Sequence, residues 1–292
     1  MEGLVVGNKN MDYALKRLKD YGINSDNKIF IIAEIGINHG GDLNLAKKLI
    51  ESAKRAGADA VKFQTYITEK RASRETPVFD TLKKCELRFK AFKELKEYAE
   101  SQGIIFLSTA FDEESLEYLK NIGCDLYKIA SFDVTNHKFL AKIAETGKTL
   151  IMSVGMSNLN EVEQAYNILK VKNNKIVILH CISAYPTREE DANIAAIYTL
   201  KQNFPCLIGQ SDHTNDIFVP FCAAAAGAQV LEKHYKISKD MDCADAPVSI
   251  TEEQMKILVK RLRRLEKIWG CGEVALSPAQ EKTLVYRKHS HL

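Results

Sequence analysis

The chain has 292 residues, 46% of them hydrophobic and 27% charged, so it can bury a full-sized core and is neither disordered nor fibrous. Its 41 basic and 38 acidic residues leave a formal net charge of +3, and the basic residues are scattered, which argues against a nucleic-acid partner. The seven cysteines include no CxxC pair, no apolar run reaches the roughly 20 residues of a membrane span, and no signal-peptide pattern is present. A cytoplasmic protein without a membrane partner is expected.

From residue 29 onward, short β-rich apolar runs alternate with longer amphipathic stretches, a pattern typical of repeated βα units. Strands are predicted at residues 29–34, 60–64, 104–107, 126–129, 149–152, 176–180, 207–210 and 229–234. After the first strand, Leu45, Leu49, Ala53 and Ala56 fall at helical spacing, and Gly57 is predicted as the C-cap. Eight such units predict an α/β fold, a closed (β/α)8 TIM barrel. An open doubly wound sheet is the structural alternative, but no GxGxxG turn follows the first strand.

The barrel is predicted to be a single domain at residues 29–280. Residues 1–28 form a short N-terminal extension, with a polar helix predicted at about 11–21. Residues 65–86 exceed an ordinary βα loop and are predicted to form a lid or substrate loop. Residues 281–292 are predicted to be a polar tail.

Active sites of parallel barrels form at the carboxyl ends of the strands, and nearly every predicted strand ends here in polar residues. Lys62 and Lys128 lie within otherwise apolar strands. A single such lysine is equally consistent with an outward position or an internal salt bridge. Two of them beside hydroxyl side chains favour an anionic, phosphate-bearing ligand, because lysine supplies charge and hydroxyls supply directional donors. These hydroxyls belong to Thr109, Ser131, Ser153 and Ser211.

His213 and His234 end neighbouring predicted strands, and histidine is the commonest protein ligand of metals. A lone histidine would favour a structural role, but two on adjacent strand ends favour a divalent metal site. Asp212 and Glu232 are expected to accept hydrogen bonds from the two rings. Few protein ligands would leave positions open for water and substrate, as Lewis-acid catalysis requires. His180 is expected to point into the barrel, without an assigned role.

Six motifs together resemble the N-acetylneuraminate synthase family, which includes sialic, legionaminic and pseudaminic acid synthases. They keep the family's order from about residue 29 to residue 280. The motifs are Ile32-Ala33-Glu34-Ile35-Gly36-Ile37-Asn38-His39-Gly40-Gly41, Lys62-Phe63-Gln64-Thr65, Tyr127-Lys128-Ile129-Ala130-Ser131, His180-Cys181 with Tyr185-Pro186-Thr187, Ser211-Asp212-His213-Thr214, and Glu232-Lys233-His234. The resemblance implies a condensation of phosphoenolpyruvate (PEP) with the aldehyde of an open-chain N-acyl hexosamine. The products would be a nonulosonic, sialic-acid-like 2-keto sugar acid and phosphate.

The resemblance also implies a role for each matching residue. Those expected to hold PEP are Lys62, Thr109, Lys128, Ser131, Ser153, Gly155, Ser183 and Ser211. His213 and His234 would bind Mn2+, or alternatively Mg2+ or Co2+, which polarises the aldehyde oxygen. Glu34 would handle protons or orient the attacking water, and it completes a catalytic set with the two lysines and the two histidines. Those expected to contact the sugar are Gln64, Asp133, Tyr185 and Asp245.

The chain departs from the family pattern at the sugar end of the expected site. Asp133 stands where the family usually carries Glu, Ala110 where it carries Pro, and Gln210 where it carries Leu or Tyr. Many members continue into a C-terminal antifreeze-like domain that brings an arginine into the partner subunit's active site, whereas this sequence ends at residue 292. Arg71 or Arg74 of the 65–86 segment is the expected replacement for that cation, and a homodimer is the family precedent.

Two other functions stay open. One is a PEP condensation with a different sugar aldehyde, which would give a shorter keto-sugar acid. The other is a barrel that binds PEP or a sugar without catalysis. The intact set of Glu34, Lys62, Lys128, His213 and His234 argues against the second, because decayed enzymes tend to lose such residues first.

Overall fold

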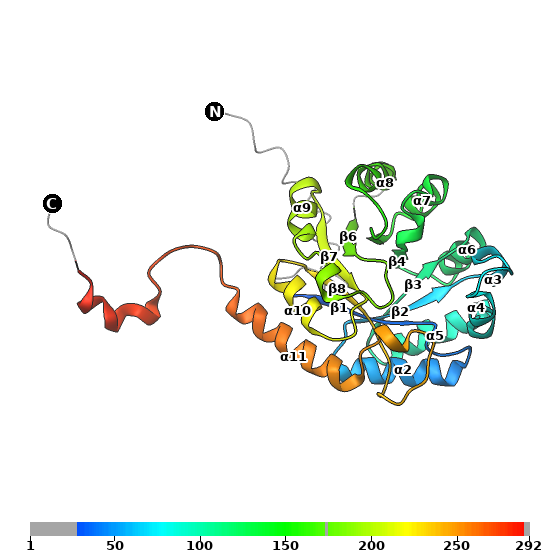
Figure 1. Cartoon of the computed structure of the whole chain (residues 1–292), viewed down its shortest axis with the longest axis horizontal. Helices are drawn as coiled ribbons and strands as arrows, with labels where there is room; N and C mark the ends of the chain where they lie inside the picture. The colour runs from blue at the N-terminus through cyan, green and yellow to red at the C-terminus, as the bar shows by residue number, and fades with distance from the viewer. Residues whose placement is uncertain (1–27, 173–174, 289–292) are drawn as a thin grey trace.

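The computed structural model describes residues 28–172 and 175–288, which form a closed barrel of parallel strands surrounded by helices (Figure 1). The strands follow chain order around the barrel: β1 (Phe30–Gly36), β2 (Ala60–Thr65), β3 (Ile105–Ala110), β4 (Leu126–Ile129), β5 (Thr149–Ser153), β6 (Ile176–Cys181), β7 (Leu207–Asp212) and β8 (Val230–His234). The last strand pairs with the first, with Val230 opposite Phe30 and His234 opposite Glu34. This closure confirms the predicted (β/α)8 barrel and excludes the doubly wound sheet, which stays open.

A helix follows each strand. The helices are α2 (Leu43–Ala56), α5 (Phe89–Ser101), α6 (Glu113–Asn121), α7 (His137–Ala144), α8 (Leu159–Lys172), α9 (Ala196–Asn203), α10 (Phe218–Ala225) and α11 (Glu252–Ile268). Asp42 caps α2 by accepting hydrogen bonds from the amides of Asn44 and Leu45, and Gly57 ends this helix as predicted, at a left-handed φ of 89°. Short 3-10 helices, η1 (Ser131–Asp133), η2 (Glu189–Asp191) and η3 (Ala246–Val248), lie in the loops that follow β4, β6 and β8.

Side chains of the strands alternate between the barrel axis and the surrounding helices. Inward side chains from all eight strands form a buried apolar layer. They are Phe30, Ile32, Ala60, Leu107, Leu126, Ile151, Val177, Leu179, Leu207 and Val230. Outward side chains pack against the helices in a second, larger apolar layer. The next inward position on β1, β2, β4 and β8 is charged, and these residues are Glu34, Lys62, Lys128 and Glu232. Inside the barrel, a layer of charged side chains therefore lies directly next to the apolar layer.

The long segment between β2 and α5 contains two short helices, α3 (Thr68–Arg71) and α4 (Phe79–Cys85). Tyr66 Oη donates to the carbonyl of Leu82 at 2.8 Å, and the amide of Thr68 donates to Glu86 Oε2 at 3.1 Å. These bonds hold the segment together and place the end of α3 at the mouth of the barrel. Its predicted role as a lid stays a prediction.

Residues 269–288 are exposed and lead away from the barrel (Figure 1). They include η4 (Pro278–Tyr286), so the domain boundary predicted at residue 280 falls within this segment. The helix predicted at residues 11–21 lies outside the described residues. Among the helices of the described part, none is long and apolar enough to cross a membrane.

Candidate active site

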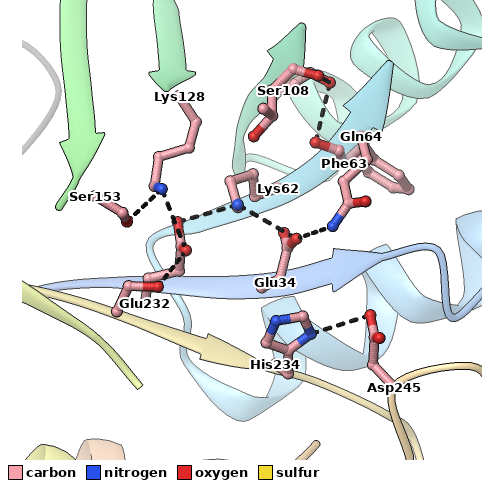
Figure 2. Close-up of polar contacts among 12 residues, drawn as sticks. Glu34, Lys62, Phe63, Gln64, Ser108, Lys128, Ser153, Glu232, His234 and Asp245 are labelled. Carbon is pink, nitrogen blue, oxygen red and sulfur yellow. Dashed lines mark hydrogen bonds and ion pairs between the residues drawn. The ribbon is translucent and has the colours of Figure 1, made fainter. Parts of the chain in front are cut away.

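Four charged side chains form a connected network around the barrel axis (Figure 2). Lys62 Nζ lies 3.3 Å from Glu34 Oε1 and 3.3 Å from Glu232 Oε2, and Lys128 Nζ lies 3.6 Å from Glu232 Oε1. All four residues are at most 5% exposed. Burial of a charge requires a partner, and each lysine has a carboxylate as its partner. The lysines thus face the axis and form internal ion pairs at the same time.

The network sets the charge state of its members. Burial alone would lower the pKa of Lys62, but the carboxylates of Glu232 and Glu34 outweigh it and raise that pKa. For Lys128 burial prevails and lowers the pKa to about 8, although Glu232 opposes it. Burial would raise the pKa of Glu232, but Lys128 and Lys62 lower it. Near neutral pH both lysines are therefore mainly cations beside a carboxylate anion.

Hydroxyl and amide groups surround Lys128. Its Nζ donates to Ser153 Oγ at 2.5 Å, and Ser131 Oγ accepts a hydrogen bond from the amide of Gly155 at 2.9 Å. A side chain at position 155 would not fit, because a Cβ there would lie 2.3 Å from Ser183 Oγ. The glycine lets the backbone approach closely and brings an amide into the same cluster as three hydroxyls.

These groups line one pocket, which holds about 450 Å³ of empty space including its open mouth. Its wall contains seven of the eight residues expected to hold PEP: Lys62, Thr109, Lys128, Ser131, Ser153, Ser183 and Ser211. The eighth, Gly155, is hydrogen-bonded to Ser131. Ser211 Oγ also donates to Glu232 Oε1 at 2.8 Å, so it joins the charged network. The fold therefore gathers these residues from β2 through β7 at one place.

His213, just after β7, and His234, at the end of β8, lie with their ring centroids 5.3 Å apart. Each ring has one nitrogen engaged. His213 Nδ1 donates to the carbonyl of Ile182 at 2.7 Å, and His234 Nδ1 lies 3.2 Å from Asp245 Oδ2 (Figure 2). This arrangement leaves Nε2 of both rings for an external ligand.

The partners of the two rings differ from those predicted. Glu232 lies one inward position deeper than His234 and pairs with the lysines. Asp212 faces the outer side of the sheet, where its Oδ2 lies 2.7 Å from Lys233 Nζ. The prediction that these two carboxylates accept hydrogen bonds from the rings was therefore wrong. The loop carboxylate of Asp245 forms an ion pair with His234 instead, and the backbone carbonyl of Ile182 accepts the hydrogen bond from His213.

The imidazole pair fits a divalent ion that keeps several positions for other ligands. Burial and the neighbouring His234 lower the pKa of His213 to about 3, so this ring is neutral and can coordinate a metal. Burial would lower the pKa of His234 too, but Asp245 raises it, and a carboxylate behind a histidine is common at metal sites. Within the described ranges, no group of three or more His, Cys, Asp or Glu side chains is arranged to hold a metal. The metal stays a prediction with two candidate protein ligands.

At the mouth of the pocket, Gln64 connects Glu34 to Arg71. Gln64 Nε2 donates to Glu34 Oε1 at 2.9 Å, and Gln64 Oε1 accepts from Arg71 Nη1 at 2.8 Å. The Arg71 guanidinium carbon lies 3.8 Å from the ring centroid of Phe111 and 4.6 Å from that of Tyr66. Two aromatic faces and one amide thus fix the guanidinium at the entrance.

The sequence model of the NeuB family matches residues 49–274, most of the barrel. The chain belongs to the NeuB family. An uncharacterized protein of Methanocaldococcus jannaschii is 41% identical, covering 94% of this chain and 82% of its own. The N,N'-diacetyllegionaminic acid synthase of Campylobacter jejuni is 39% identical, covering 88% of this chain and 82% of its own. The crystal structure of an N-acetylneuraminic acid synthetase from Leptospira borgpetersenii, in complex with citrate, superposes with a TM-score of 0.88 at 39% identity over 91% of this chain and 93% of its own. With synthases as its named relatives, this NeuB-family chain is a transferase of the NeuB synthase type.

Four residues of this NeuB-family enzyme were expected to contact the sugar, and two of them line the pocket while the other two do not. Gln64 and Tyr185 line the pocket, and the Tyr185 ring lies 4.0 Å from that of His213. Asp245 is engaged by His234. Asp133 is absent from the pocket wall; its Oδ1 accepts from Asn136 Nδ2 at 3.2 Å, and burial raises its pKa. Contact of these four residues with a sugar stays a prediction.

The outward position of His180 corrects the expectation that its ring points into the barrel. It follows the inward Leu179, and its Nε2 hydrogen-bonds to the carbonyl of Ala192 at 2.8 Å. Of the two arginines considered for the entrance, Arg71 lines the pocket. Arg74 instead lies over the ring of Phe79 at 5.8 Å and is absent from the pocket wall.

Sequence reasoning missed two aromatic groups in the NeuB-family pocket and the partners of Glu232. Glu232 was expected beside the histidines, but it is the carboxylate that pairs both lysines; its period-two spacing from His234 was the signal that placed it on the inner face. Phe111 and Phe132 line the mouth, and Phe132 is 63% exposed there. Neither phenylalanine carried a sequence signal, because loop aromatics follow no period.

Proposed function

We propose that this chain condenses PEP with the aldehyde of an N-acyl hexosamine, giving a nonulosonic 2-keto acid and phosphate. The observation that carries the proposal is a single pocket with two inward lysines and several hydroxyls at its base and two imidazoles beside them. The lysine side suits a small polyanion, and the imidazole side suits a metal-assisted carbonyl reaction. Kinship with sialic and legionaminic acid synthases supports the same chemistry.

The base of the pocket would bind PEP. Lys62 and Lys128 supply two positive charges, while Ser131, Ser153 and the other hydroxyls supply directional hydrogen bonds. In the free protein the lysines share Glu232, so an entering phosphate or carboxylate competes with that side chain for them. The site is therefore preorganised around the cations before the ligand arrives.

In the proposed reaction, the π electrons of the C2–C3 double bond of PEP form a bond between C3 and the aldehyde carbon, and the aldehyde oxygen gains a proton to become a hydroxyl. Water adds at C2, and the bond between C2 and the phosphate oxygen breaks, so that the water oxygen becomes the keto oxygen. In net terms one proton of the water goes to the aldehyde oxygen and the other to the departing phosphate. Glu34 Oε1 is held by Lys62 and Gln64, whereas the buried Oε2 has no hydrogen-bond partner among the described residues. An unpaired buried acceptor of this kind is suited to take the proton of the adding water.

His213 and His234 would hold the metal through their Nε2 atoms, with Mn2+ first among the candidates and Mg2+ and Co2+ as alternatives. A bound divalent ion supplies Lewis acidity toward the aldehyde oxygen, where negative charge develops. Asp245 keeps the His234 ring oriented, and the carbonyl of Ile182 does the same for His213.

Product mass after incubation with PEP, Mn2+ and a panel of aldoses tests the proposal. Phosphate release with N-acetylmannosamine or a 2,4-diacetamido-hexose, and a nine-carbon acid as product, is the expected result. His213→Ala should abolish this turnover, while the exposed surface variant His137→Ala should leave it unchanged. Turnover with pentose or hexose phosphates alone would indicate the shorter keto acid. PEP binding without product from any aldose would contradict an enzymatic role.

We infer that the enzyme works in a reducing compartment such as the cytoplasm. All seven cysteines lie in the described part of the chain, and each is a free thiol. Thiol titration of the freshly purified, unfolded protein should count all seven as reactive.

A further inference from the structure

Arg71 is the cation at the entrance of the pocket, and its chemistry differs from that of the lysines at the base. It is the last residue of α3, is partly buried, and uses one N–H group on Gln64. No acceptor among the described residues binds its other N–H groups. Because Phe111 and Tyr66 hold the guanidinium plane, these free donors have a fixed direction at the pocket wall.

The charges around Arg71 argue against a phosphate as its ligand. Burial disfavours its charged form and lowers its pKa, while Asp245 and Glu34 favour that form through their negative charges. Asp133 is a third acid whose charge interacts with Arg71. A phosphate that reached Arg71 would approach these three carboxylates, of which Glu34 is already paired with Lys62 and Asp245 with His234. A neutral oxygen acceptor avoids that repulsion and still gains a charge-assisted hydrogen bond.

Aromatic side chains that line the same pocket supply an apolar surface. Phe132 is 63% exposed, Tyr185 is 50% exposed, and Phe111 packs under the guanidinium. A ligand group that matches this wall has a carbonyl oxygen for the arginine and a short apolar end for the rings. The acylamino substituent of an amino sugar has both features, whereas a sugar hydroxyl lacks the apolar end.

We propose that Arg71 is a specificity-determining residue that binds the carbonyl oxygen of the acceptor's acylamino group. This inference rests on the proposed function, because it names the acceptor group read by the same site. It separates the pocket into a base that binds the polyanion and an entrance that selects a neutral, N-acylated sugar.

Equilibrium binding by calorimetry, without PEP, tests the inference independently of turnover. The ligands are N-acetylmannosamine and mannose, which lacks the acylamino group. In Arg71→Met, the Kd for N-acetylmannosamine should rise about 10- to 100-fold, the range for a hydrogen bond to a charged group, while the Kd for mannose stays within about threefold. Arg71→Lys, which keeps the charge but loses the planar fork, should fall between wild type and Arg71→Met.

Arg74→Met is the matched control, because Arg74 belongs to the same segment but is absent from the pocket wall. It should bind both sugars like wild type, and all variants should bind PEP like wild type. Equal losses for both sugars, no binding of either sugar to wild type, or tighter wild-type binding of N-acetylmannosamine 6-phosphate than of the neutral sugar would overturn the inference. Absence of turnover in the product-mass experiment would instead count against the proposed function.

Discussion

Lys128 reaches the barrel axis from β4, where burial lowers its pKa to about 8. The charged and titratable groups that face it are Glu232, Lys62, Cys181 and Glu34. Glu232, Cys181 and Glu34 favour the lysine cation and Lys62 disfavours it, but desolvation is larger than any of them. This residue therefore loses its proton at a lower pH than an ordinary lysine does.

The affinity for PEP should consequently fall as pH rises through about 8. A group with this pKa is about 90% protonated at pH 7 and about 10% protonated at pH 9, so the Kd for PEP should increase about tenfold across that range. Lys128→Met should bind PEP more weakly at pH 7 and show a smaller change with pH. Calorimetric titration at several pH values measures both proteins, and parallel pH profiles would contradict the prediction.

Gly155 places its amide where a side chain would collide with Ser183. In Gly155→Ala the new Cβ would lie 2.3 Å from Ser183 Oγ and 3.0 Å from Ser131 Oγ, so one hydroxyl must move. We expect the Kd for PEP to rise at least about tenfold, as for the loss of one charge-assisted hydrogen bond. The double variant with Ser183→Ala removes the closer oxygen and should recover part of the affinity. A double variant that binds PEP no better than Gly155→Ala would sink this explanation.

At the scale of elements, the loop between β8 and α11 is held to the loop after β1 by Asn38. Asn38 Nδ2 donates to the carbonyl of Tyr235 at 3.0 Å and to Ser249 Oγ at 2.9 Å, and its Oδ1 accepts from the amide of Asp245 at 2.8 Å. Asn38 is 1% exposed. The Asn38 side chain therefore fixes the position of the loop that carries Asp245, the carboxylate partner of His234.

Asn38→Ala should lower the free energy of unfolding by about 2–4 kcal/mol, because it leaves the buried carbonyl of Tyr235 and the half-buried amide of Asp245 without their partner. Urea denaturation monitored by circular dichroism measures the change. Asn203→Ala is the matched control, since Asn203 is exposed and its side chain bonds, within the described part of the chain, to the carbonyl of Thr199 in its own helix. The two variants should differ clearly, and equal stabilities would show that the loop is held by other contacts.

At the scale of the whole molecule, the groups expected to hold PEP come from β2 through β7 and their following loops. A ligand that contacts so many strands binds the closed barrel and not the unfolded chain. PEP at about 100 times its Kd should therefore stabilise the fold by about 2.7 kcal/mol. Urea denaturation with and without PEP measures this value. EDTA should leave this stabilisation by PEP intact, because the imidazoles are separate from the lysines. If EDTA abolished the stabilisation, PEP would bind to the metal instead.

The sequence alone determined the barrel fold and most of the residues that line the pocket. Alternation of apolar runs with amphipathic stretches located all eight strands to within three residues, because the two patterns have periods of 2 and 3.6. The largest errors lie at carboxyl ends, as in β3 and β7, which continue to Ala110 and Asp212 beyond the predicted ends at 107 and 210. There the hydrogen-bonded ladder continues after the apolar residues stop. Because parallel strands bring their carboxyl ends together, polar residues far apart in the chain could be assigned to one site.

Only the tertiary structure decided which partner each polar residue takes. Glu232 pairs with two lysines, whereas Asp212 pairs with Lys233 on the opposite face of the sheet. Asp245 reaches His234 from a loop, and Arg71 rather than Arg74 enters the pocket. Period-two alternation specifies whether a strand side chain points toward the barrel axis or toward the helices. The depth of that side chain along the axis depends on the register between neighbouring strands. The direction of a loop residue depends on long-range hydrogen bonds such as those of Asn38, which no local pattern encodes.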